Sequence, residues 1–108
     1  MLKTLIETLF GKAHILKGKE LAHALSKKYS PEFENNSQKK VSEKRLTRIL
    51  EGIYNQALTY KADTGIGVFG VARLSHAFQW ELKDLGYSDK FVDLASEGFT
   101  VYLARKKK

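Results

Sequence analysis

Residues 63–70 read DTGIGVFG and place Gly65, Gly67 and Gly70 at the spacing G-x-G-x-x-G. In dinucleotide-binding proteins this spacing follows a β-strand, opens a helix and belongs to a βαβ unit of about thirty residues. The segment before these glycines, residues 42–61, instead carries apolar residues at the period of a helix. We therefore predict a tight turn between two helices, in which at least one of the three glycines adopts a positive φ angle.

The apolar residues on either side of this turn predict one helix before it and one after it. The first begins at Ser42, whose hydroxyl can cap the free amides of the first turn, and it ends near residues 61–63. The second covers residues 71–85 and closes at Gly86, because helices commonly end on a left-handed glycine. The predicted core of both helices and of the turn comprises Leu46, Ile49, Leu50, Ile53, Ala57, Leu58, Ile66, Val68, Phe69, Val71, Leu74, Phe78, Leu82 and Leu85.

The N-terminal part of the chain predicts two further helices separated at Gly18. Apolar residues before this glycine recur at the spacing of one helical face, namely Leu2, Leu5, Ile6, Leu9, Phe10 and Ala13. A shorter helix follows, which must stop before Pro31 because proline restricts the residue that precedes it. Its core face comprises Leu21, Ala22, Leu25 and Tyr29. The polar residues 30–40, rich in Asn and Ser, are predicted to form a loop.

The C-terminal part predicts a last helix that Ser88 caps, with Phe91, Leu94 and Ala95 on its buried face. Residues 99–104, FTVYLA, are β-branched and aromatic, so they either continue this helix or form a short strand. A helix is favoured because the chain offers no convincing strand for them to pair with. A chain of 108 residues supports one core. We therefore predict an all-α fold, a compact single domain of four to five helices over residues 1–104, followed by a basic tail at residues 105–108.

The glycine motif also resembles the glycine box D-x-G-x-G of histidine-kinase ATP-binding domains, through Asp63, Gly65 and Gly67. The preceding segment, RLTRILEGIYNQALTYK, is similar to the asparagine-bearing helix of that family, and the resemblance would imply an ATP site. The chain departs from the family at Gly52 and Gln56, where the family places asparagines that help to hold magnesium. The two boxes also nearly touch, whereas the family separates them with a strand and a loop. We therefore expect no nucleotide cofactor.

No residue pattern points to catalysis or to a metal. The chain contains no cysteine, which excludes disulfides, thiolate nucleophiles and zinc–thiolate sites. Ser75 and His76 are neighbours on a predicted helix, so their side chains do not face each other. We therefore expect a protein that is not an enzyme and has no metal site. A weaker alternative is an anion site at the start of the helix after the glycines. The free amides of the first turn would bind the anion, and Arg73 would lie one helical turn further along.

Charge is distributed unevenly along the chain, whose net charge is +7. Residues 1–61 carry twelve Lys or Arg against six Asp or Glu, residues 62–104 carry three against six, and the tail adds four cations. This pattern favours an anionic partner, which is nucleic acid, an acidic protein or a lipid surface. The alternative is that the cations form a solvated face that only keeps the protein soluble. No apolar run approaches the roughly 18 residues that cross a bilayer, and no signal-peptide pattern is present. We expect a cytoplasmic protein that does not enter a membrane.

The strongest candidate site is a cluster of cations where the predicted loop enters the helix of residues 42–61, comprising Lys39, Lys40, Lys44, Arg45 and Arg48. Cations near a helix N-terminus oppose the helix dipole, so they do not help this helix to form. Phosphate contact explains them, with hydrogen-bonding neighbours at Asn35, Asn36, Ser37 and Gln38. The leading prediction is a non-catalytic domain that binds DNA or RNA mainly through the phosphate backbone.

The alternative is a helical protein–protein interaction module that uses the face around Trp80, with Arg73 beside it. Trp80 lies off the apolar stripe of its helix, where it either covers a second packing layer or serves as an exposed interface anchor. The partner would be an acidic protein, or a second copy of this chain in a homodimer.

Overall fold

The computed structural model describes the backbone of residues 2–36 and 41–105, and the side chains of residues 11–36 and 41–104. This part of the chain forms five helices and no strand, which confirms the all-α prediction; residues 99–104 continue the last helix. The three terminal lysines of the predicted tail lie outside the described residues. The helices are α1 (Leu2–Lys28), α2 (Pro31–Asn35), α3 (Glu43–Thr64), α4 (Val68–Leu85) and α5 (Asp89–Arg105).

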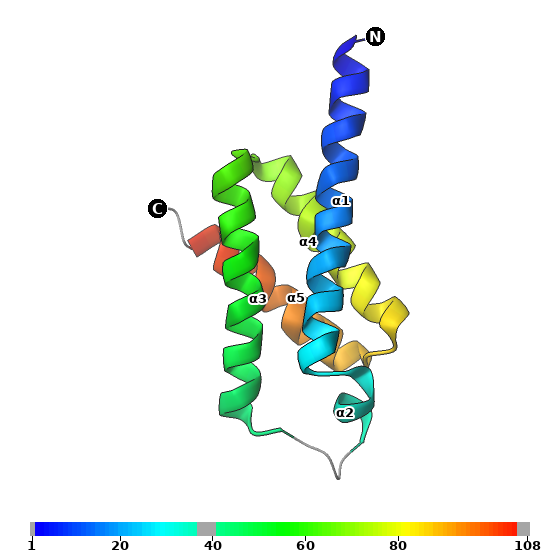
Figure 1. The fold of residues 1–108 in the computed structure, drawn as a ribbon, viewed down its shortest axis with the longest axis vertical. Coiled ribbons are helices and arrows are strands. Elements are labelled where there is room, and N and C mark those ends of the chain that lie inside the picture. Colours follow the sequence, from blue (N-terminus) through cyan, green and yellow to red (C-terminus); the bar gives the residue numbers. More distant parts are fainter. Residues whose placement is uncertain (1, 37–40, 106–108) are drawn as a thin grey trace.

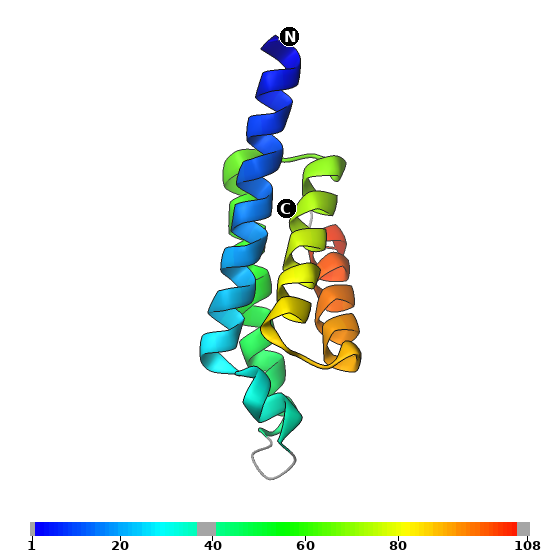
Figure 2. The same ribbon diagram turned by 90° about the vertical axis from the view of Figure 1, so that its right-hand side faces the viewer.

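The helices form two layers, with α1 and α3 in one and α4 and α5 in the other (Figures 1 and 2). Within each layer the two helices run in opposite directions. The most extensive packing joins α1 to α4, and α3 contacts α1 and α5. The first turns of α1 extend beyond the rest of the bundle (Figure 2), and the molecule measures 54 Å along its longest axis and 19 Å along its shortest.

Gly18 does not end the first helix, so the prediction of two separate N-terminal helices is wrong. A Cβ atom at Gly18 would lie 2.6 Å from the carbonyl oxygen of Leu74 and 2.8 Å from the Cβ atom of Ala77, both on α4. The missing side chain therefore lets the two helices approach closely. Gly18, which suggested a helix break, is thus a position where α1 and α4 pack closely.

The predicted core face of the second half of α1 is confirmed, since Leu21, Ala22, Leu25 and Tyr29 are buried, whereas the structure tests the predicted N-terminal stripe only at Ala13. Residues 2–10, which carry most of that stripe, have no described side chains, and Ala13 is exposed. Gly11 and His14 are buried in its place, with Gly11 under the guanidinium of Arg73 and His14 beside Gly70 of α4. In the described part of this segment, Gly11 and His14 therefore contact α4 in place of Ala13.

The predicted loop of residues 30–40 contains the short helix α2, which corrects that prediction over residues 31–35. The Ser30 hydroxyl accepts from the Phe33 amide at 3.3 Å, and Pro31 stands in the first turn, where its missing N–H costs nothing. The helix joins the two layers, because the Glu34 carboxylate accepts from both the amide and the hydroxyl of Ser88 at 2.8 Å.

The glycine turn confirms the predicted positive φ at Gly65, where φ is 63° and the amide donates to the Lys61 carbonyl. No strand precedes it in the described chain, so the dinucleotide-binding arrangement is absent from these residues. Helix α4 begins at Val68, three residues earlier than predicted. Val68 and Phe69 are 82% and 84% exposed, which corrects their assignment to the core. They occupy the first turn of α4, which lies at the margin of the packed layers (Figure 1).

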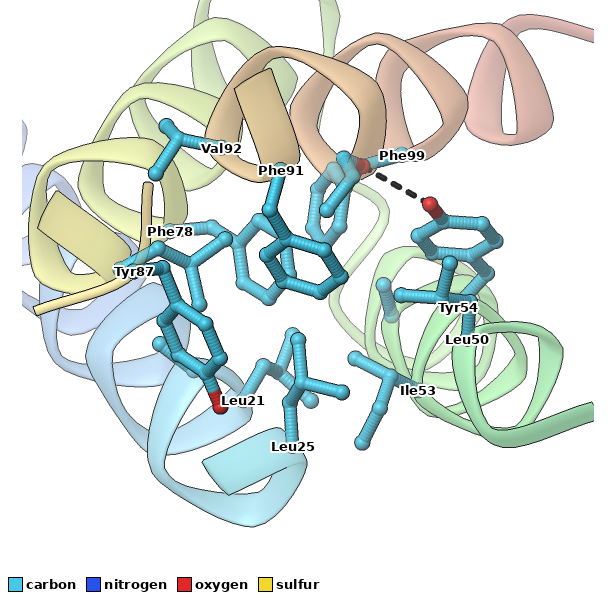
Figure 3. Packing of buried hydrophobic residues seen from close by; sticks show 14 of the residues in the cluster. Leu21, Leu25, Leu50, Ile53, Tyr54, Phe78, Tyr87, Phe91, Val92 and Phe99 are labelled. Atoms are coloured by element: carbon cyan, nitrogen blue, oxygen red, sulfur yellow. Dashed lines mark hydrogen bonds between the residues drawn. The ribbon is translucent and has the colours of Figure 1, made fainter. Parts of the chain in front are cut away.

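The core lies between the two layers and is rich in aromatic rings (Figure 3). Phe78 of α4 stacks on Phe99 of α5 with ring centroids 4.5 Å apart, and Tyr54 of α3 donates to the Ala95 carbonyl at 2.8 Å. Leu94 is 59% exposed, so its predicted place in the core is wrong. The buried face of α5 comprises Phe91, Val92, Ala95, Phe99 and Leu103.

Candidate functional site

The predicted cation cluster is partly described. Lys44, Arg45 and Arg48 lie in the first turns of α3, all exposed, while Lys39 and Lys40 lie outside the described residues. The first turn is already capped, because the Ser42 hydroxyl accepts from the Arg45 amide at 3.1 Å. Within the described chain, none of these three cations forms an ion pair. Their charges are therefore available to an external anion.

Two further cations, Lys27 and Lys28, form the last turn of α1 and are exposed. The end of α1 and the start of α3 lie at the same, lower end of the molecule (Figure 1). We call the five cations together the basic end: Lys27, Lys28, Lys44, Arg45 and Arg48. Lys27 and Lys28 could not be grouped with the cations of α3 from the sequence, because they lie more than ten residues away along the chain.

Other polar groups at this end are used within the fold. The Glu34 carboxylate is held by Ser88, and the Asn35 side-chain amide donates to the Gly86 carbonyl at 3.1 Å. Asn35 thus holds α2 against the turn between α4 and α5. Ser37 and Gln38 lie outside the described residues. Glu43, in the first turn of α3, forms no ion pair with the neighbouring cations in the described region.

Trp80 lies on the outer surface of α4 and is 53% exposed, so its ring does not cover a second packing layer. Its indole N–H donates to the His76 Nε2 at 2.6 Å, and the Lys83 ammonium lies 5.2 Å from the ring centroid. Trp80 borders a shallow groove of about 370 Å³ between α1 and α4, which Ile15 also lines. The exposed ring has the character expected of an interface anchor.

Arg73 does not lie beside the first amides of α4. Its guanidinium faces Gly11 of α1, where a Cβ atom would come within 3.1 Å of Nη1, and Arg73 lines the groove near Trp80. The cation that shares a cleft with the start of α4 is Lys61, from the last turn of α3. The sequence could not single out Lys61, because only the folding back of α4 and α5 brings it there.

Two buried titratable side chains, His14 and Tyr54, form hydrogen bonds within the fold. His14 is buried and shares a hydrogen bond with the Tyr60 hydroxyl at 2.7 Å; burial and the nearby Arg73 charge lower its pKa. Burial raises the pKa of Tyr54 to about 12. His76 accepts from Trp80, while the Ser75 hydroxyl has no partner among the described residues, so the two do not form a nucleophile–base pair. No group of acidic or histidine side chains suited to a metal ion occurs in the region that the structure describes.

Comparison with protein families, with curated proteins and with solved structures gives no match to this chain. Among the described helices, none is both long and apolar enough to cross a membrane.

Proposed function

We propose that this protein binds nucleic acid without catalysis, through phosphate contacts made by the basic end. The observation that carries the proposal is the set of three exposed cations, Lys44, Arg45 and Arg48, in the first turns of α3 without an ion pair in the described chain. In the first turn, Lys44 and Arg45 oppose the helix dipole, and a cation there costs about 0.3–1 kcal/mol. A phosphate partner offsets this cost by placing an anion at the same helix end.

The geometry favours contact with the sugar–phosphate backbone over the reading of base edges. A recognition helix follows its partner helix through a turn of three or four residues. Here α1 and α3 are separated by the whole of residues 29–42, which include α2. Neither helix is therefore presented as in that motif, and we expect affinity for DNA and RNA alike with little sequence preference.

The experiment is a fluorescence-anisotropy titration of labelled duplex DNA and single-stranded RNA at low salt. Changing Lys44, Arg45 and Arg48 together to Gln should weaken binding tenfold or more, because about three charge-assisted contacts are lost. The matched control removes three exposed lysines elsewhere, Lys12, Lys19 and Lys83, and it should bind nearly as well as wild type. Equal losses in both variants would show that only net charge matters and would overturn the assignment to the basic end.

A second candidate function is protein interaction through the face around Trp80 and Arg73. The 53% exposure of the single tryptophan favours it, since large exposed aromatic rings are enriched at binding surfaces. The partner would be an acidic protein or a second copy of this chain. If the protein does not bind DNA or RNA at low salt, where attraction to phosphate is strongest, protein interaction through the Trp80 face becomes the leading proposal.

A further inference from the structure

Helices α4 and α5 run antiparallel, side by side (Figure 2). A cleft of about 670 Å³ lies along them, whereas the groove at Trp80 lies between α1 and α4. This volume is typical of small-molecule sites, which usually occupy about 300–1,000 Å³. Its walls are mainly apolar, with Val71, Ala72 and Leu103 among the lining residues. The cleft therefore suits a ligand with an elongated apolar body.

One end of the cleft is positive. Lys61 lines it there, and its ammonium donates to the Leu103 carbonyl at 3.0 Å, which leaves two further N–H groups for a ligand. No carboxylate in the described region pairs with Lys61. Gly67 and Val68 line the same cleft, and Gly67 offers no side chain to cap the first amides of α4. The helix start and the ammonium together favour an anionic group.

Two hydroxyl groups farther along the cleft lack hydrogen-bond partners among the residues that the structure describes. Ser96 of α5 is only 9% exposed and lines the cleft, and its Oγ atom forms no hydrogen bond within the described chain; the same holds for the Oγ atom of Ser75 on α4. A buried hydroxyl left without a partner costs about 1–3 kcal/mol, so such groups are uncommon. Ser75 lies about 12 Å beyond Gly67 along the helix axis, at 1.5 Å per residue. Each Oγ atom has less than 1 Å² of accessible surface, so a rotation of the side chain about χ1 toward the cleft is needed before a ligand polar atom at that distance from the anionic group can satisfy it.

We propose that this cleft binds an amphipathic carboxylate that carries a hydroxyl or carbonyl group at the far end of its apolar chain. The carboxylate lies against Lys61 and the first amides of α4, the chain lies along the apolar walls, and the distal polar group hydrogen-bonds to Ser75 and Ser96. This site is separate from the basic end, so it stands or falls independently of nucleic-acid binding.

The test is an NMR titration of the full chain with the ω-hydroxy derivative of decanoate, below its micelle-forming concentration. We expect saturable amide shifts at residues 67–70 and at Ser96. Decanoate should bind more weakly, because it leaves both serines unpaired, and decanol more weakly still, because it lacks the charge. Acetate should not saturate the site. Equal binding of decanol and decanoate, or no saturable shift with any of the four, would overturn the proposal.

Variants locate the two polar contacts. Lys61→Met should weaken binding of the hydroxy acid about tenfold or more, as expected for a lost charge-assisted hydrogen bond. Its matched control, Lys90→Met, removes an exposed lysine at the other end of α5 and should leave binding unchanged. Ser96→Ala should reduce the affinity for the hydroxy acid toward that for decanoate while decanoate binding stays the same. Unchanged affinity in both Lys61→Met and Ser96→Ala would contradict the assigned geometry.

Discussion

Replacing Gly18 by alanine tests the packing of α1 on α4, which sets the arrangement of the two layers. The added Cβ atom would lie 2.6 Å from the Leu74 carbonyl oxygen, 2.8 Å from the Ala77 Cβ atom and 3.0 Å from the Phe78 amide nitrogen. These are backbone atoms or a Cβ atom of α4, so no flexible side chain can turn aside. The two helices must therefore separate where they cross.

The expected effect is a balance of two terms. Overpacking of a rigid contact typically costs about 1–3 kcal/mol, and the absence of a movable neighbour puts this contact at the upper end. Replacing glycine by alanine inside a helix returns about 0.5–1 kcal/mol. We therefore expect Gly18→Ala to lower the free energy of unfolding by about 2 kcal/mol. For a domain of this size, that loss lowers the Tm by roughly 8–16 °C.

Urea unfolding followed by circular dichroism measures the effect, with Gly52→Ala as the matched control. Gly52 lies inside α3, and a Cβ atom there would meet nothing within 4 Å, so its replacement should stabilise the protein by about 0.5–1 kcal/mol. The two variants should differ by about 3 kcal/mol. If Gly18→Ala is as stable as Gly52→Ala, then α1 and α4 do not meet closely at this position and the reasoning fails.

Three further results are expected. Burial raises the pKa of Tyr54 to about 12 in the folded protein, whereas the unfolded chain ionises near the ordinary value of 10, so stability should fall as the pH rises from about 10 to about 12. Tyr54→Phe should reduce that loss and should cost about 1 kcal/mol at neutral pH, as urea titrations at neutral and alkaline pH will show. Because the pKa of His14 is lowered in the folded protein, the unfolded chain binds a proton on this side chain at higher pH, so stability should fall as the pH drops below about 6.5. The urea midpoint of His14→Gln should depend less on pH than that of wild type, and an equal dependence would refute this role of His14. Trp80 emission in dilute protein should be that of a water-exposed indole, open to quenching by iodide, and a blue-shifted, protected emission would contradict its exposure.

Helices α3, α4 and α5 could be predicted because local signals agree with the tertiary structure. The hydroxyls of Ser42 and Ser88 cap the starts of α3 and α5, each accepting from an amide three residues later. Gly65 and Gly86 close α3 and α4 in the left-handed conformation. At these positions the preference of each residue and the packing of the helix lead to the same conformation.

The errors arose where tertiary contacts outweigh local pattern. Gly18 resembles a helix break in the sequence. In the structure it lies inside α1, at a position where a side chain would clash with Leu74 and Ala77 of α4, more than fifty residues away in the sequence. Ser30 followed by Pro31 is a helix-start signal that the polar composition of residues 30–40 obscured. For the candidate sites, the sequence identified the cations of α3, but it could not show that Lys61 and Ser96 line the same cleft. That juxtaposition depends on how α4 and α5 fold back along α3.

The salt dependence of nucleic-acid affinity tests the proposed function most directly. The log of the affinity for duplex DNA should fall linearly with the log of the salt concentration, by about 0.9 per phosphate contact. Changing Lys44, Arg45 and Arg48 to Gln should make this slope shallower by roughly two to three, since each residue loses about one contact. A triple variant that keeps the wild-type slope, or a wild-type protein that does not bind at low salt, would contradict nucleic-acid binding at the basic end.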